Sequence, residues 1–485
     1  MIKIFNILGL RLSWLLMALA IVVALAVRLY KIDVIPYGYH VDELASSVTV
    51  ECLATEGVDA HNNRYPLFGQ TNYGTPKPAT YMYPAILWGK AFSFSVPSLR
   101  SFSVWGHFLG IAGLFFLGRV LFGNAYGLWA AFLGAISPWV WTSSRVAFES
   151  LLAPTFFIWG LFFFFRRSTY FHWAMAGLLF AAAMYSYPPM RLQVPLLFIT
   201  LVGYASFKKT KAPFLLWLVI IACLALPVIP LVMKTLSGEL QQRFNSISIV
   251  APAYLTNIGK TNSIHDLWGI FLSNYQLHLT SDFLLFKGDP SLIHSVGHFG
   301  ILDWLDVGAL ILCLFWALLF WIQPLRKYNP WQGQSLFLLF LLVNIFLGIV
   351  PAALTNSEIP NSLRIVGSWP FMCLLGAYFM HHLQRWFWPL GLIAVIVGIM
   401  FFSAFAKTYF TVYREESKGM FSYWANDQVA AAKTEEDWRN FMLAYSTQDY
   451  HFRYFLMHYR SDKCTSTRLK WERQRDLLQS LHLYY

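Results

Sequence analysis

The sequence predicts an all-α polytopic membrane protein with about eleven transmembrane helices. Of its 485 residues, 57% are hydrophobic and 12% are charged, about half the charged share of a soluble domain. Mean hydropathy is +0.50. The apolar residues gather in runs of about 20, the length that a helix needs to cross a bilayer. Most of the chain is therefore expected to be surrounded by lipid or by its own helices.

The turns between the apolar runs set an orientation. We expect spans at about 12–29, 101–118, 124–141, 149–165, 171–187, 192–207, 212–232, 303–323, 332–350, 364–381 and 387–406. With the N-terminus in the cytoplasm, every inner turn is basic, as the positive-inside rule requires. These turns hold Arg119, Arg166, Arg167, Lys208, Lys209, Lys211, Arg326, Lys327 and Arg385. No small-residue cleavage site follows the first run, so we expect an uncleaved helix.

One further apolar segment, 78–94, is predicted to lie on the outer surface as an interfacial helix. Counting it as a span would turn the basic turns after it to the outside, and its Pro84 and Lys90 suit an interface. The predicted organisation is a transmembrane domain over 1–406, with long outer loops at about 30–100 and 233–302. A small extracytoplasmic C-terminal domain is expected over 407–485.

Charge and cysteine content narrow the class of protein. The net charge is +12, but the basic residues are spread between apolar runs, so nucleic acid is not an expected partner. The five cysteines show no CxxC or other metal spacing. Cys52 and Cys464 can pair only if both lie outside the cytoplasm.

The first candidate site is His40-Val41-Asp42-Glu43, just after the first span. Adjacent carboxylates near a membrane surface are costly unless they are used or solvated. Asp42 is a candidate general base for an attacking hydroxyl, with Glu43 orienting or binding. The structural alternative is that Asp42 caps a juxtamembrane helix.

Two outer cations have a functional and a structural interpretation. Lys77, in Thr75-Pro76-Lys77-Pro78, is suited to hold a phosphate as a point charge, or else it snorkels from an interfacial helix. Arg145 breaks the positive-inside pattern in the turn after Ser137-Pro138-Trp139. It is aimed at an anionic group, or it forms an i, i+4 ion pair with Glu149.

Three more polar turns are predicted on the outer face. They are Tyr187 to Arg191, Gly288 to Ser291 followed by His294 and His298, and Thr355 to Arg364 with Glu358 inside it. Asp289, His294 and His298 suggest, as an alternative interpretation, a binding site for a divalent cation. Their spacing fits no established ligand signature. We therefore predict no cofactor and do not favour a metal.

The shared location of these motifs is the argument for a function. The outer cations are Lys77, Arg145, Arg191 and Arg364. Cations that stabilise a developing phosphate charge, beside the carboxylates Asp42 and Glu43, suit displacement of a phosphate leaving group by a hydroxyl. The membrane setting indicates that a lipid carries the phosphate.

Several of these segments together resemble a known family. They are Val41-Asp42-Glu43-Leu44-Ala45, Gly74-Thr75-Pro76-Lys77-Pro78-Ala79, Ser98-Leu99-Arg100-Ser101 through Arg119-Val120-Leu121-Phe122-Gly123, Ser137-Pro138-Trp139 with Ser144-Arg145, Gly288-Asp289-Pro290, and Ile359 to Arg364. Each is degenerate, but their order over residues 10–370 resembles the GT-C membrane glycosyltransferases. The nearest group contains the protein O-mannosyltransferases, of glycosyltransferase family 39, and the aminoarabinose transferase of lipid A.

The resemblance implies inverting transfer of a sugar from a polyprenyl-phosphate donor to a lipid, glycan or protein acceptor. The setting would be the outer face of a bacterial inner (plasma) membrane. It implies catalytic roles for Asp42 and Glu43, and phosphate contacts for Lys77, Arg145 and Arg364. Candidate substrate contacts are His40, Tyr81, Glu149, Arg191, Asp289, His294 and Glu358. Pro76 stands where aminoarabinose transferases carry glutamate, which leaves the acceptor open.

Two other classes share some of these features. A transporter or flippase of a lipid-linked substrate would also have spans and outer cations, but it should place ionisable residues at mid-membrane depth. Few residues do so here, among them His107 and Asn344. A phosphoethanolamine or acyl transferase would need a nucleophile with metal ligands or a His–Asp pair, for which the Asp289 and His294 region is the candidate.

Overall fold

The computed structural model describes residues 2–59, 61–70, 76–166, 169–208, 214–240, 242–321, 334–421 and 463–465. In these ranges the chain is built from helices and one short antiparallel sheet, in which β1 (Phe68–Gly69) pairs with β2 (Lys77–Pro78). Most of the predicted C-terminal domain, 407–485, lies outside the described residues. So do Arg167, Lys209, Lys211, Arg326 and Lys327 of the basic turns.

Apolar helices dominate, and the protein is an integral membrane protein. Within the described ranges, seven helical segments are long and apolar enough to cross a membrane. They lie in α1 (Ile2–Leu29), α4 (Val96–Phe122), α7 (Leu152–Arg166), α9 (Met190–Phe207), α10 (Phe214–Leu236), α15 (Ser335–Leu347) with α16 (Val350–Ala353), and α18 (Trp388–Thr408) with the turns that follow it.

The other predicted spans also coincide with helices. They are α5 (Asn124–Ile136), α8 (Tyr170–Ser186), α14 (Trp304–Trp321) and α17 (Trp369–Trp386). The span predicted at 364–381 begins later, at Trp369, because a 3₁₀ turn, η5 (Val366–Ser368), precedes it and Pro370 occupies the first turn of the helix. The number of spans stays a prediction.

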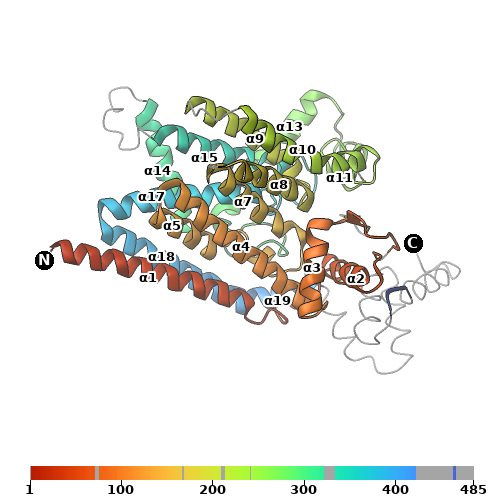
Figure 1. Ribbon diagram of the computed structural model, residues 1–485, viewed down its shortest axis with the longest axis horizontal. Coiled ribbons are helices and arrows are strands. Elements are labelled where there is room, and N and C mark those ends of the chain that lie inside the picture. The colour runs from red at the N-terminus through yellow and green to blue at the C-terminus, as the bar shows by residue number, and fades with distance from the viewer. Residues whose placement is uncertain are drawn as a thin grey trace. The chain divides into compact units, whose positions relative to one another are not determined.

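The chain forms two compact units, and the first comprises residues 1–28, 106–142 and 152–409. Its central helix is α17, which is buried along most of its length and packs against α5, α14, α15 and α18. Beside this group, α8 packs against α7, α9 and α10, and Figure 1 shows these helices side by side.

Short elements connect the helices of this first unit. They are α11 (Gln242–Ile247), α12 (Pro252–Asn257), α13 (Ile264–Leu277), a π turn η2 (Asp282–Phe286) and α16. Ser263 caps α13 by accepting a hydrogen bond from the Asp266 amide, which satisfies one of the free donors at the start of the helix.

The second unit comprises residues 29–105, 143–151 and 410–485. Its elements are α2 (Val41–Glu56), β1, β2, α3 (Ala79–Ala91), the start of α4, the 3₁₀ turn η1 (Glu149–Leu151), η6 (Tyr409–Tyr413), α19 (Arg414–Glu416) and η7 (Lys418–Phe421), with α6 (Trp141–Ser144) at its boundary. α2 packs against α3. A disulfide joins Cys52 of α2 to Cys464, so the two cysteines do pair.

The segment predicted as an interfacial helix, 78–94, forms the 13-residue helix α3. Among the described helices it is not one that is long and apolar enough to span. Tyr81 and Met82 are buried, whereas Leu87 and Phe92 are largely exposed, so α3 has one face against the protein and one apolar face turned away. Its place on the outer membrane surface stays a prediction.

Candidate active site

The start of α2 fixes the first carboxylates. His40 Nδ1 accepts a hydrogen bond from the Asp42 amide at 3.2 Å, and the His40 amide donates to Glu43 Oε2 at 3.0 Å. This is a reciprocal cap of the kind that satisfies the free amides of a first helical turn. The cap of α2 is therefore His40 and not Asp42. The His40 ring also packs edge-on against Phe148.

Lys77 lies between two carboxylates of the second unit. Its backbone is held in β2 opposite Gly69. Its Nζ lies 2.9 Å from Glu149 Oε2 and 3.4 Å from Asp42 Oδ1. Burial acts to lower the pKa of Lys77, but the charges of Asp42 and Glu149 outweigh it and raise that pKa above its ordinary value. The lysine is therefore held as a cation.

The three charged groups differ in how far they reach solvent. The Lys77 side chain is 1% exposed and that of Glu149 is 11% exposed. The Asp42 side chain is 25% exposed. Asp42 is thus the member of the group that an incoming molecule meets, and Lys77 with Glu149 forms the buried part behind it.

Both carboxylate oxygens of Glu43 accept hydrogen bonds from other residues of the second unit. Arg100 contacts it in the two-pronged manner typical of arginine, with Nε 2.7 Å from Oε1 and Nη2 2.8 Å from Oε2. The Ala147 amide donates to Oε1 at 2.9 Å. Both side chains are fully buried, and Arg100 also donates to the carbonyls of three loop residues, Ile32, Pro36 and Gly38.

Arg100 was not singled out from the sequence as a site residue. The signal in the sequence is its position at the end of a predicted span, among the segments of the family resemblance. No spacing rule connects it to Glu43, which lies 57 residues away. The pair fixes the start of α2 and, through it, the position of Asp42.

The Arg145 side chain contacts other residues of the second unit. Its Nη2 donates to the carbonyls of Tyr30 at 2.9 Å and Ile35 at 3.0 Å, and its guanidinium lies over the Phe410 ring. The expected i, i+4 pair with Glu149 is not the arrangement found, because residues 145–148 are not helical and Glu149 pairs with Lys77.

Tyr81 lies near the same carboxylates. Its hydroxyl donates to the Ala147 carbonyl at 3.4 Å. Burial, with the nearby charges of Glu149 and Glu43, raises its pKa. Tyr81 is therefore a neutral hydroxyl at the edge of the Asp42 site.

A second set of polar residues belongs to the first unit. Asp289 Oδ2 accepts from the Ser362 amide at 2.6 Å and from its hydroxyl at 3.0 Å. Burial raises the pKa of Asp289 to about 6. His278 Nδ1 lies 2.8 Å from the Asn274 carbonyl, and His278 Nε2 accepts from the Asn361 amide at 3.0 Å. Burial lowers the pKa of His278 to about 4. These bonds join the loops after α13 and α16.

Arg364 is bound within the second of these loops. Its Nη1 donates to the Thr355 hydroxyl at 2.8 Å and to the Ser357 carbonyl, and its Nη2 lies 3.4 Å from Glu358. Arg364 belongs to the first unit, whereas Lys77 and Arg145 belong to the second.

The remaining predicted site residues also lie in the first unit. Arg191 Nε donates to the Met184 carbonyl at 3.5 Å, and the His294 amide donates to Ser291. In the part of the chain that the structure describes, no group of three or more His, Cys, Asp or Glu side chains has the arrangement of a metal site.

The fold and this site define a polytopic membrane protein whose second unit carries a lysine, Lys77, between two carboxylates, Asp42 and Glu149. The fold is similar to that of GT-C glycosyltransferases. ArnT from Cupriavidus metallidurans, solved with undecaprenyl phosphate bound, has 12% identity and a TM-score of 0.50, over 94% of this chain and 88% of that one. At this identity the likeness shows the fold alone.

A second similar structure is the oligosaccharyltransferase AglB from Archaeoglobus fulgidus, in complex with an inhibitory peptide and a dolichol-phosphate. It has 14% identity and a TM-score of 0.48, over 85% of this chain and 57% of that one. No protein-family model and no curated protein matches this sequence.

Proposed function

We propose that this protein transfers a sugar from a polyprenyl-phosphate donor to a hydroxyl acceptor, with inversion at the sugar carbon. The observation that carries the proposal is the buried Lys77 ammonium between Glu149 and the more exposed Asp42. The GT-C-like fold supports it, since ArnT, with this fold, was solved with undecaprenyl phosphate.

Lys77 is suited to stabilise the leaving phosphate. An ammonium has three N–H donors. Glu149 takes one at 2.9 Å, and the 3.4 Å contact with Asp42 is long enough to be weak. At least one donor is then left for a phosphate oxygen, and the buried surroundings strengthen its effect on charge that develops there.

Asp42 is suited to act as the general base. The acceptor oxygen attacks the sugar carbon from the face opposite the phosphate, and its proton passes to the Asp42 carboxylate. The bond from that carbon to the phosphate oxygen breaks, and the polyprenyl phosphate leaves with the electron pair. One carbon–oxygen bond forms and one breaks, the acceptor's proton moves to Asp42, and no co-reactant is needed.

Glu43 and Arg100 are positioning residues in this proposal. Their contacts with loop carbonyls and with the Ala147 amide hold the start of α2 in place. Arg145 and Arg364 donate to backbone carbonyls of their own units, which favours a similar loop-ordering role over direct contact with the phosphate.

The outer face of a bacterial inner membrane is the proposed location. The basic turns favour this orientation for the second unit. The Cys52–Cys464 disulfide supports it, because disulfides persist in oxidising compartments and are rare in the cytosol.

The test compares glycolipids and glycoproteins by mass spectrometry in a deletion strain, with wild-type or Asp42→Asn protein restored. We expect one sugar modification to disappear on deletion, to return with the wild type and to stay absent with the variant. An unchanged set of glycolipids and glycoproteins on deletion would contradict the proposed reaction.

A further inference from the structure

Helix α13 of the first unit has three distinct sides. Residues four apart lie along one side of a helix, and here Ile264, Trp268 and Leu272 form an apolar row. Their exposed fractions are 88%, 59% and 40%. Ile270 and Asn274, on another side, are buried against the protein. The third side, which is exposed and polar, carries His265 and Ser273.

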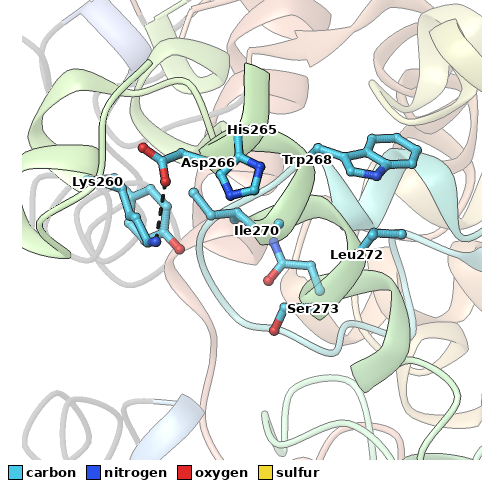
Figure 2. Close-up of a pocket in the computed structure, with 10 residues that line it drawn as sticks. Lys260, His265, Asp266, Trp268, Ile270, Leu272 and Ser273 are labelled. Carbon is cyan, nitrogen blue, oxygen red and sulfur yellow. Dashed lines mark ion pairs between the residues drawn. The ribbon is translucent and has the colours of Figure 1, made fainter. Parts of the chain in front are cut away.

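Figure 2 shows how these sides separate. The Trp268 indole points away from the ion pair that Lys260 forms with Asp266 at 3.3 Å. A hollow of about 560 Å³ beside the helix is lined by both kinds of group, with Ser273 and His265 as polar members and Trp268 and Leu272 as apolar ones. A surface that carries apolar and polar side chains next to each other fits the boundary between lipid and water.

Hydrogen bonds tie α13 to the end of a candidate span. The Tyr275 hydroxyl donates to the Phe346 carbonyl at 3.0 Å, and Asn274 Nδ2 donates to the carbonyls of Ala353 and Thr355 at 3.2 and 2.8 Å. Residues 335–353 are one of the candidate spans. Helix α13 is thus tied to the point where that span ends.

The span that α13 contacts also carries exposed apolar side chains. Leu339 and Phe346 of this span are 51% and 43% exposed, as expected of side chains that face lipid. The carbonyl of Phe346 is the group that Tyr275 contacts. With 14 residues, α13 is about 21 Å long, which is too short to cross the roughly 30 Å core of a bilayer.

We infer that α13 lies in the membrane surface, with Ile264, Trp268 and Leu272 inserted among the lipids of the leaflet where span 335–353 ends. The occupant of this apolar face is the bilayer. Trp268 suits this depth because its ring is apolar while its indole N–H can reach the headgroups. The polar side with His265 and Ser273 faces water, as in other interfacial amphipathic helices. The inference does not depend on the proposed reaction.

The experiment uses spin labels on the full chain in phosphatidylcholine–phosphatidylglycerol vesicles. Cysteine is introduced at Ile264, Trp268 or Leu272, with His265→Cys and Ser273→Cys as controls on the same helix. The background carries Cys223→Ala, because Cys223 is a partly exposed free thiol. Each label is tested for collision with oxygen, which dissolves in lipid, and with a nickel chelate, which stays in water.

We expect the ratio of oxygen to nickel collisions to be several-fold higher at the three apolar positions than at the two controls. High nickel access at all five positions would place α13 in water and overturn the inference. Exclusion of both reagents from the apolar row would mean that protein covers it, which also overturns the inference. If one variant fails to fold, the other two positions of the row still decide.

Discussion

Glu149 accepts a hydrogen bond from Lys77 at 2.9 Å across 72 residues of sequence, and both side chains are nearly excluded from solvent. Neither charge is stable there alone, because the charge that remains after one partner is removed has lost its hydration without compensation. Asp42 shares the same ammonium but keeps contact with solvent. The pair therefore holds Lys77 as a fixed cation behind a carboxylate that remains accessible.

The Lys77→Met variant is expected to lose both stability and donor use. Removal of one partner of a buried ion pair costs about 3–5 kcal/mol, so the unfolding temperature should fall. With Lys77→Ala or Lys77→Met, the donor concentration that gives half-maximal rate should rise. Thermal unfolding in detergent and transfer rates at varied donor concentration measure the two effects.

The double variant Lys77→Met with Glu149→Gln separates these effects. It removes both charges, so most of the lost stability should return. Donor use should stay poor, because no cation faces the phosphate. Recovery of normal donor dependence in the double variant would remove Lys77 from the proposed phosphate site.

The Asp42→Asn variant should insert and fold normally but lose transfer. Asp42 is the most exposed of the three charged groups, so its substitution should change the unfolding temperature little. Loss of a general base typically lowers the rate by about 10²–10⁴-fold. The matched control is Asp33→Asn, since Asp33 is an exposed acid of the same unit. Retained activity in Asp42→Asn would exclude Asp42 as the base.

Substitution of Glu43 or Arg100 is expected to lower the folding free energy, because both are positioning residues and neither takes part in the proposed chemical step. Arg100→Lys keeps the charge but loses the two-pronged contact with Glu43, and Glu43→Gln leaves a buried guanidinium without its counter-charge. We expect Glu43→Gln to cost about 3–5 kcal/mol of folding free energy. Arg100→Lys should cost less, because both charges remain. The effects should be far less than additive in the double variant. Additive losses would show that the pair does not act as one unit.

The class of fold and the proximity of Asp42 to Lys77 are easier to predict from the sequence than the hydrogen-bond partners of each charged side chain. Hydropathy runs are local signals, and each predicted span coincides with a helix. Asp42 and Lys77 belong to the same predicted outer loop, between two predicted spans, so the predicted topology already places both residues on one face. Arg145 illustrates the limit, because its partners are backbone carbonyls about 110 residues away, which no side-chain pattern records.

Asp289 and His278 should make opposite contributions to stability below neutral pH. Burial raises the pKa of Asp289 to about 6 from an ordinary 3.8, so the folded state binds the proton more tightly and loses stability as pH rises from 4 to 6. Burial lowers the pKa of His278 to about 4 from 6.5, so the folded state loses stability as pH falls from 6.5 to 4. Each effect corresponds to about 3 kcal/mol.

Two variants should make these opposed effects visible. Asp289→Asn leaves the His278 effect unopposed, so its unfolding temperature should fall more steeply on acidification than that of the wild type. His278→Gln should show the reverse, with relative stabilisation between pH 6 and pH 4. Melting curves by intrinsic fluorescence over that range measure both. Parallel pH profiles in all three proteins would contradict the assignment.

The disulfide between Cys52 and Cys464 predicts a labelling pattern and a dependence on reductant. A maleimide–polyethylene glycol reagent applied to unfolded protein should label the three cysteines outside the disulfide, Cys223, Cys313 and Cys373, and label two more after reduction. Cys52→Ser should free Cys464 without reductant and lower stability by about 2–5 kcal/mol, the usual effect of removing a native disulfide. Since Cys52 lies on α2, which carries Asp42 in its first turn, reduction should also lower transfer, which Cys223→Ser should not do. Full labelling before reduction would mean that both cysteines are free thiols, and the support that the disulfide gives to an extracytoplasmic second unit would be lost.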